Sequence, residues 1–156
     1  MQPFTAYTAI PKAVLHALKF ERADAAAIDV ARAMALRGLV SNDVVITHIP
    51  TVPARVRLRG YDQAALIARE LARVTGAAYT PLLARTGGGR QVGQTRAVRR
   101  AQMQQAFRPL RPHVVQNKHV LLIDDVLTTG ATCEAAARVL REAGAKRVSA
   151  LVFAVA

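Results

Sequence analysis

The sequence has little cysteine, few aromatic residues and no long apolar run, and each shortage excludes a class of protein. One cysteine, Cys133, allows neither an internal disulfide nor a cysteine-rich zinc site, and the 4 histidines lack the spacing of metal ligands. No apolar stretch reaches the roughly 18 residues of a membrane span, and residues 1–10 do not resemble a secretory signal. We therefore expect a soluble cytoplasmic protein, without zinc and without stable membrane insertion.

Acidic residues are also scarce, since 10 of them stand against 22 basic residues, for a net charge of +12. Between Arg55 and Arg111, 12 arginines accompany only Asp62 and Glu70. Arginine suits phosphate groups and stacks on bases, so this balance is typical of nucleic-acid binding, although a solvated face is the alternative. The few aromatic side chains in this stretch favour attraction to a nucleic-acid backbone over sequence reading: Tyr61, Tyr79 and Phe107.

Apolar spacing predicts alternating helices and strands in a chain long enough for one domain. Helices are expected over 11–20, 24–36, 63–74, 95–107 and 131–143, and strands over 44–49, 78–83, 119–123 and 147–155. Residues 85–95 are expected to form a mobile loop, and 108–117 a connection that contains proline. The alternation predicts an α/β fold with a central, mostly parallel sheet flanked by helices, and the N-terminal helices are candidates for a small cap.

The run Val-Leu-Leu-Ile-Asp-Asp-Val-Leu-Thr-Thr-Gly-Ala-Thr at 120–132 is the most informative segment. It predicts a buried strand, two carboxylates, a loop rich in hydroxyl groups and then a helix N-terminus. Free backbone N–H groups and the hydroxyls of Thr128, Thr129 and Thr132 favour a dianionic phosphate, and Gly130 allows its close approach. Asp124 and Asp125 would repel a phosphate, so they are expected to accept hydrogen bonds from ribose hydroxyls or to hold magnesium. The alternative is a polar strand end before an ordinary helix.

A second anion-directed segment follows the strand predicted at 44–49. Arg55, Arg57 and Arg59 lie within five residues. Like charges this close repel one another, and binding of an anion such as pyrophosphate would offset the repulsion. If the segment is extended, Arg55 and Arg59 share a side, so we assign these two to pyrophosphate. A solvated basic loop is the alternative.

The run at 120–132 resembles the phosphoribosyl pyrophosphate (PRPP) motif of the type I phosphoribosyltransferases. Further stretches resemble the ComF family, which is associated with DNA uptake in competent bacteria and with use of DNA as a nutrient. They are Ile10–Phe20, Ile49-Pro-Thr-Val-Pro, Arg55 with Arg59-Gly-Tyr-Asp-Gln-Ala, Arg85-Thr, Gln91-Val-Gly, Arg96, Arg99 and Ala106-Phe107. The Arg-Gly-Tyr-Asp-Gln stretch is the most specific of them.

The resemblance implies one phosphoribosyltransferase-like domain over 1–156, with a helical cap at 1–40 and a core at 41–156. It implies binding of Mg²⁺ with PRPP, or of a related phosphoribosyl ligand, through Asp124, Asp125, Val126, Leu127, Thr128, Thr129, Gly130, Ala131 and Thr132. Asp124 and Asp125 would hold the Mg²⁺ directly or through ribose hydroxyls.

The resemblance also implies that the arginine-rich side holds single-stranded DNA, through Arg85, Arg90, Arg96, Arg99 and Arg100. A helicase or channel of DNA uptake is the expected protein partner, and it would bring the chain to the inner face of the membrane. The chain departs from the family in lacking a four-cysteine zinc module and in carrying Gln102, Gln104 and Gln105 where an asparagine is usual.

Two other functions share these residues. One is an active nucleobase phosphoribosyltransferase of nucleotide salvage, in which Mg²⁺-bound PRPP loses pyrophosphate to an incoming base. The other is a DNA- or partner-binding scaffold with an unused pocket. The acceptor base is not evident from the motifs, so the sequence leaves catalysis open.

Overall fold

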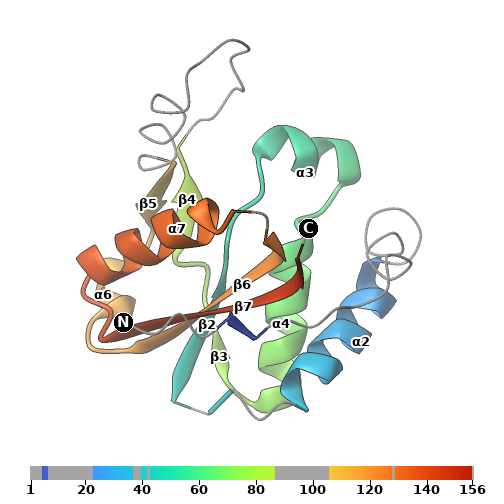
Figure 1. The fold of residues 1–156 in the computed structure, drawn as a ribbon, viewed down its shortest axis with the longest axis horizontal. Coiled ribbons are helices and arrows are strands. Elements are labelled where there is room, and N and C mark those ends of the chain that lie inside the picture. Colours follow the sequence, from blue (N-terminus) through green and yellow to red (C-terminus); the bar gives the residue numbers. More distant parts are fainter. Residues whose placement is uncertain are drawn as a thin grey trace.

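The fold is built on a parallel sheet. The structure is a computed structural model that describes residues 5–6, 23–36, 40–41, 43–86, 106–127 and 129–155. The five strands of the sheet run in the order β1-β7-β6-β2-β3, and every pair is parallel. The strands are β1 (Thr5–Ala6), β2 (Val44–His48), β3 (Ala78–Tyr79), β6 (His119–Leu127) and β7 (Arg147–Val155) (Figure 1). The predicted α/β fold with a central parallel sheet is confirmed.

Two apolar clusters cover the two faces of this sheet. On one face, α2 (Ala23–Ala35) and α4 (Gln63–Thr75) pack together over alternate side chains of β2 and β6, such as Ile46 and Ile123. On the other face, α7 (Ala131–Glu142) covers the intervening side chains, such as Val45 and Leu122. Because the strands are buried on both faces, they read as continuous apolar runs in the sequence.

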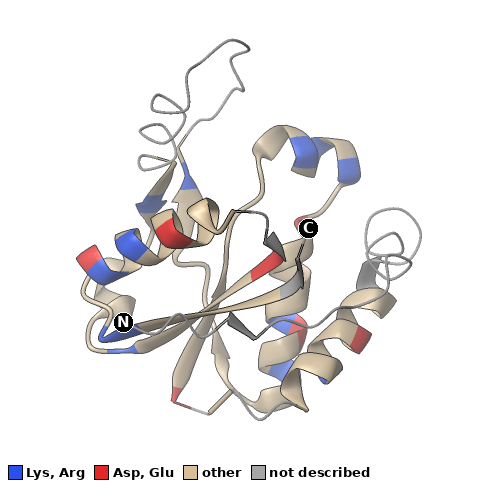
Figure 2. Ribbon diagram, in the orientation of Figure 1, with Lys and Arg blue, Asp and Glu red and all other residues tan. Residues whose placement is uncertain are grey.

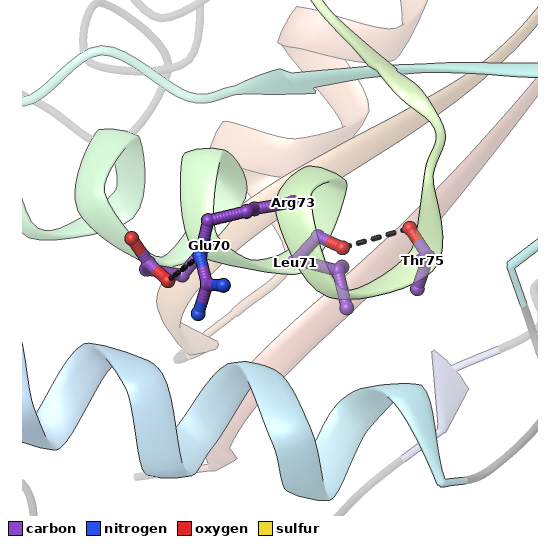
Figure 3. A network of polar contacts seen from close by, with 4 residues as sticks. All are labelled: Glu70, Leu71, Arg73 and Thr75. Carbon is purple, nitrogen blue, oxygen red and sulfur yellow. Dashed lines mark hydrogen bonds and ion pairs between the residues drawn. The ribbon is translucent and has the colours of Figure 1, made fainter.

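The helices α2 and α4 both begin and end close to the residues expected from their apolar spacing. The Asp62 side chain caps α4 by accepting the Ala65 N–H at 3.3 Å, and Gly76 ends it with a φ of 73°. In the last turns of α4, the Thr75 hydroxyl donates to the Leu71 carbonyl at 2.7 Å (Figure 3). The division into a cap at 1–40 and a core at 41–156 stays a prediction, and α2 itself lies in the layer packed on the sheet.

The segment predicted as one strand at 78–83 forms two separate strands. After β3, Pro81 has no N–H for the sheet, and the N–H of Leu82 bonds instead to the buried Thr47 hydroxyl at 3.1 Å. The chain then forms β4 (Leu83–Arg85), which pairs antiparallel with β5 (Phe107–Pro109) in a second sheet. The chain therefore leaves the main sheet at Leu82, whose N–H is bonded to Thr47, and the two-stranded sheet begins at the next residue.

Four other expectations differ from the structure or lie outside the described residues. Phe107, expected at the end of a basic helix, is in β5, and the connection at 108–117 contains a short helix, α6 (Pro112–Val115). Residues 95–105 of that basic helix and the helix at 11–20 lie outside the described residues. Of the loop expected at 85–95, Arg85 is instead the last residue of β4, and residues 87–95 lie outside the described part. Within the part of the chain that the structure describes, no helix is both long and apolar enough to cross a membrane.

Candidate functional site

The candidate site lies at the carboxyl edge of the sheet, where the strands differ in length. β2 pairs with β6 only as far as His48 and Ile123, whereas β7 continues beside β6 to Leu127. The strand predicted at 119–123 is therefore longer, and Asp124, Asp125, Val126 and Leu127 are still within β6. Because β2 has ended, Asp124 lies beside the loop that leaves β2, whose Ile49 N–H bonds to the Ile123 carbonyl at 2.9 Å.

Asp124 is a buried carboxyl, with 9% of its surface exposed. Burial and the neighbouring Asp125 carboxylate raise the pKa of Asp124 from 3.8 to about 7. One oxygen accepts the Asp125 N–H at 2.9 Å, and the other lies 3.7 Å from the Cys133 sulfur. Burial and Asp124 in turn raise the pKa of Cys133 to about 12, so this thiol stays protonated and can donate to the carboxyl.

The described part of the turn after β6 places a left-handed glycine immediately before a helix. Gly130 has a φ of 76°, in the left-handed region that favours glycine, and it immediately precedes α7. The Ala131 N–H lies 3.5 Å from the Thr129 hydroxyl, and the Glu134 N–H makes the first intrahelical bond, to the Gly130 carbonyl. Thr129 and Ala131 are exposed and Thr132 is half-buried, while Thr128 lies outside the described residues.

The arginine segment after β2 forms a helix, α3 (Pro53–Arg59), and the extended conformation considered from the sequence is wrong. Proline suits the first turn of a helix because its missing N–H would have no partner there. Residues four apart share a face of a helix, so Arg55 and Arg59 still lie on one side and Arg57 does not. The pair selected from the sequence is therefore kept for a different geometric reason.

Arg85, the last residue of β4, is within electrostatic range of Arg55 on α3 and of Asp124 on β6. Burial lowers the pKa of its guanidinium, the Arg55 charge lowers it further, and the Asp124 carboxyl opposes both. The side chain is half-buried, stacks over the Phe107 ring with 5.2 Å to the centroid, and donates to the Pro50 carbonyl at 3.4 Å. Its Nε is buried and has no hydrogen-bond partner among the described residues. The carboxyl edge thus carries basic groups from α3 and β4 around the acidic end of β6 (Figure 2).

Sequence reasoning grouped Arg85 with the DNA-binding arginines, and that assignment stays a prediction. The other four, Arg90, Arg96, Arg99 and Arg100, lie outside the described residues. The nearness of Arg85 to Asp124 had no signal in the sequence, since the two are far apart along the chain. Its position two residues before three consecutive glycines was a local hint of a special backbone setting.

The chemistry of Asp124 and Asp125 fits a magnesium ion that arrives with a phosphorylated ligand. Mg²⁺ prefers oxygen ligands and usually binds through one or two carboxylates together with substrate phosphates and water. The described residues contain no group of 3 or more side chains that could ligate a metal by themselves. A bound cation would also offset the repulsion that raises the pKa of Asp124.

A separate groove of about 680 Å³ lies between the two-stranded sheet and α7. Its walls include Phe107, Arg108, Arg138 and Glu142, and none of the residues of the Asp124 edge lines it. The groove is therefore distinct from the candidate site.

Known proteins resemble the chain over the part that carries this site. Residues 59–155 match the family described as "Phosphoribosyl transferase domain". The chain belongs to this family. Its relatives include two proteins named "DNA utilization protein YhgH". The one from Escherichia coli O157:H7 is 30% identical over 145 residues, which cover 86% of this chain and 63% of that protein. The one from Salmonella typhi is 32% identical over 152 residues, covering 91% of this chain and 66% of that protein.

The chain therefore spans just under two thirds of the length of these relatives. Together with the family match, they confirm the ComF-like, type I phosphoribosyltransferase relationship predicted from the sequence. Among solved structures, a glutamine phosphoribosylpyrophosphate amidotransferase from B. subtilis, complexed with ADP and GMP, has a TM-score of 0.63 and 22% sequence identity. The structural match covers 90% of this chain and 30% of the amidotransferase, and it supports the fold alone.

Proposed function

We propose that this chain binds Mg²⁺ with PRPP, or a related phosphoribosyl ligand, at the carboxyl edge of its sheet and holds single-stranded DNA on its arginine-rich side. The observation that carries the proposal is the setting of Arg85: its half-buried guanidinium lies over the Phe107 ring, its Nε has no partner among the described residues, and it is within electrostatic range of both Arg55 and Asp124. It links the arginine helix to the acidic end of β6, so one ligand can meet cationic and carboxylate groups together. A phosphoribosyl ligand offers both anionic phosphates and neutral hydroxyls.

The ribose and its 5′-phosphate are assigned to the motif strand and the turn after it. Asp124 and Asp125 accept hydrogen bonds from the ribose hydroxyls, with Mg²⁺ held by the same carboxylates. The phosphate lies against the turn at 128–132. Gly130 in this turn is left-handed and has no Cβ, so a phosphate can approach the backbone N–H groups closely. The positive end of the α7 dipole adds to the attraction for a dianion.

The pyrophosphate is assigned to Arg55 and Arg59 on one face of α3, and we add Arg85 to this set. The Nε of Arg85 has no partner among the described residues, and burial and the Arg55 charge lower the pKa of its guanidinium despite the opposing Asp124 carboxyl, so this cation has room for a further anion. An incoming pyrophosphate would relieve the repulsion between Arg85 and Arg55. Charge-assisted hydrogen bonds of this kind contribute about 1.5–3 kcal/mol each.

The DNA-binding part of the proposal depends on composition and on relatives. Arg90, Arg96, Arg99 and Arg100 supply a dense positive charge, and the two relatives are named for DNA utilization. A helicase or channel of DNA uptake is the proposed partner, which would recruit a cytoplasmic protein to the inner face of the membrane. An arginine-rich segment with few aromatics should bind strands by their phosphates.

Calorimetric titration with PRPP in the presence of Mg²⁺ tests the ligand. Asp125→Asn should weaken binding at least about tenfold, since a hydrogen bond to a charged group contributes about 1.5–3 kcal/mol. Asp29→Asn is a matched control, because it removes the same charge from an exposed position of α2, a helix that contributes no residue to the site. Absence of binding heat for the wild-type chain, or equal affinities for Asp125→Asn and wild type, would contradict the proposal.

Catalysis is the second candidate function, and the match to a transferase domain favours it. An active enzyme would release pyrophosphate from Mg²⁺-bound PRPP when a nucleobase is supplied. A coupled pyrophosphate assay against a panel of purines and pyrimidines separates the two functions. Steady release with one base identifies a salvage enzyme, whereas binding without release favours a binding protein.

A further inference from the structure

The orientation of α3 is not set by packing. None of its seven residues is buried, and Leu58 in its middle is 86% exposed. A helix this short is unstable by itself in water. Polar contacts at its two ends must therefore hold it over the carboxyl edge of the sheet (Figure 1).

The Asp62 carboxylate joins the segment before α3 to the helix after it. One oxygen accepts the Thr51 N–H at 2.8 Å, and the other accepts the Thr51 hydroxyl at 3.1 Å and the Ala65 N–H at 3.3 Å. These bonds close a loop across 11 residues, with α3 inside it. Asp62 thus caps α4 and fixes the start of the arginine segment with the same side chain.

The end of α3 is tied to the same turn of α4. Gly60 adopts a φ of 84° and its N–H bonds to the Val56 carbonyl at 2.7 Å. Gln63, only 3% exposed, accepts a hydrogen bond from the Arg59 guanidinium at 2.8 Å. The Arg-Gly-Tyr-Asp-Gln stretch therefore combines an anchored arginine, a left-handed turn and two anchoring side chains.

The strand from which the loop leaves is also held by polar contacts. The His48 ring nitrogen Nδ1 lies 3.0 Å from the Tyr79 hydroxyl on β3, and the two rings stack. The next residue, Ile49, bonds through its N–H to β6 immediately before Asp124. The base of the loop is fixed beside the acidic pair, and the Thr51 bonds to Asp62 extend this support to the start of α3.

We infer that Asp62 is a positioning residue: by bonding Thr51 it orients α3, and so presents Arg55 and Arg59 to the pyrophosphate. This inference rests on the proposed pyrophosphate role of the two arginines. In this role Asp62 acts through Thr51 and α3, with its oxygens occupied by Thr51 and Ala65. It acts because misdirected arginines lose contacts whose strength depends on distance and angle.

The replacement Asp62→Asn separates this role from the stability of α4. Asparagine caps a helix about as well as aspartate, so the bond from the Ala65 N–H is retained. The carboxamide has only one acceptor oxygen, and its NH₂ group cannot accept the Thr51 N–H. Thr51→Val is a second variant that removes only the hydroxyl contact and leaves the cap of α4 unchanged.

The test measures binding of inorganic pyrophosphate with Mg²⁺ by calorimetry, together with thermal unfolding and hydrogen exchange of the Thr51 amide. We expect Asp62→Asn to weaken binding about tenfold and Thr51→Val about threefold, with faster exchange at Thr51 in Asp62→Asn and little change in unfolding temperature. Asp29→Asn should match the wild type in every measurement.

The outcomes are distinct. If the wild type binds pyrophosphate and both variants bind it equally well, the positioning role is refuted while the proposed ligand site stands. If the wild type does not bind, the pyrophosphate assignment and the positioning role fail together. If affinity falls only in proportion to a loss of folded protein, Asp62 is a structural residue and the inference is overturned.

Discussion

Replacement of Asp124 by asparagine should make the protein more stable at pH 8, although Asp124 lies in the proposed ligand site. The wild-type carboxyl is buried and next to a second carboxylate, and these two causes raise its pKa from 3.8 to about 7. In the unfolded chain the group ionises near its ordinary pKa. The folded state therefore holds more protons than the unfolded state between about pH 4 and pH 7.

The sign and the size of the effect follow from this difference. The free energy of unfolding falls as pH rises through this window, because ionising the buried carboxyl is costly, and it levels off above about pH 7. Each pKa unit corresponds to about 1.4 kcal/mol, so a rise from 3.8 to about 7 sets an upper limit of about 4 kcal/mol. Because Asp124 interacts strongly with a neighbouring charge, we expect the measured loss to lie below this limit, at about 1–3 kcal/mol.

Urea unfolding at several pH values between 4 and 8, in buffer free of phosphate and Mg²⁺, measures this dependence. Asp124→Asn should remove most of the decline and exceed the wild type in stability at pH 8. Its carboxamide oxygen can still accept the Asp125 N–H. Asp29→Asn should keep the wild-type decline. An undiminished decline in Asp124→Asn would refute the assignment of a perturbed carboxyl at this position.

Three other predictions address the arginines and the core. Arg85→Gln should weaken binding of inorganic pyrophosphate with Mg²⁺ about tenfold in calorimetry and leave the affinity for an oligonucleotide unchanged; the reverse pattern would return Arg85 to the DNA-binding set. Arg96→Ala with Arg99→Ala should reduce the slope of log affinity against log salt by about 0.7 per lost phosphate contact, in fluorescence anisotropy with a single-stranded oligonucleotide. An unchanged slope would mean that these charges are only solvated. Leu71→Ala, at a fully buried position of α4, should lower the free energy of unfolding by about 2–5 kcal/mol in urea titration, and a change below about 1 kcal/mol would contradict its place in the core.

The long periodic elements could be predicted from the sequence because their burial pattern is local. In α4, apolar residues recur at helical spacing and Gly76 ends the helix, and both signals lie within the segment itself. The strand β6 is buried on both faces, and its apolar run showed this directly. Short elements carry less of this signal. The helix α3 buries no residue, so it has no apolar period, and its proline and arginines suited either a loop or a helix.

The pairing of β4 with β5 was not predictable in the same way. Leu83 pairs with Pro109, and residues between them contribute no periodic pattern that indicates the partner. The end of sheet pairing after β3 depends on the Thr47 hydroxyl, which accepts a hydrogen bond from the Leu82 N–H although the two residues are 35 positions apart. Contacts of this range are set by where the whole chain packs.

The sequence alone determined the α/β alternation, the chemistry of the Asp124–Thr132 turn and the choice of Arg55 and Arg59, because each depends on residue types at short spacing. Only the tertiary structure showed that Arg85 is within electrostatic range of Arg55 and Asp124, and that the Asp62 carboxylate bonds Thr51 ahead of the arginine helix. The physical reason is that charge and hydrogen-bonding contacts act through space. Residues distant in the chain meet at one edge of the sheet only after the two apolar clusters have brought the strands and helices together.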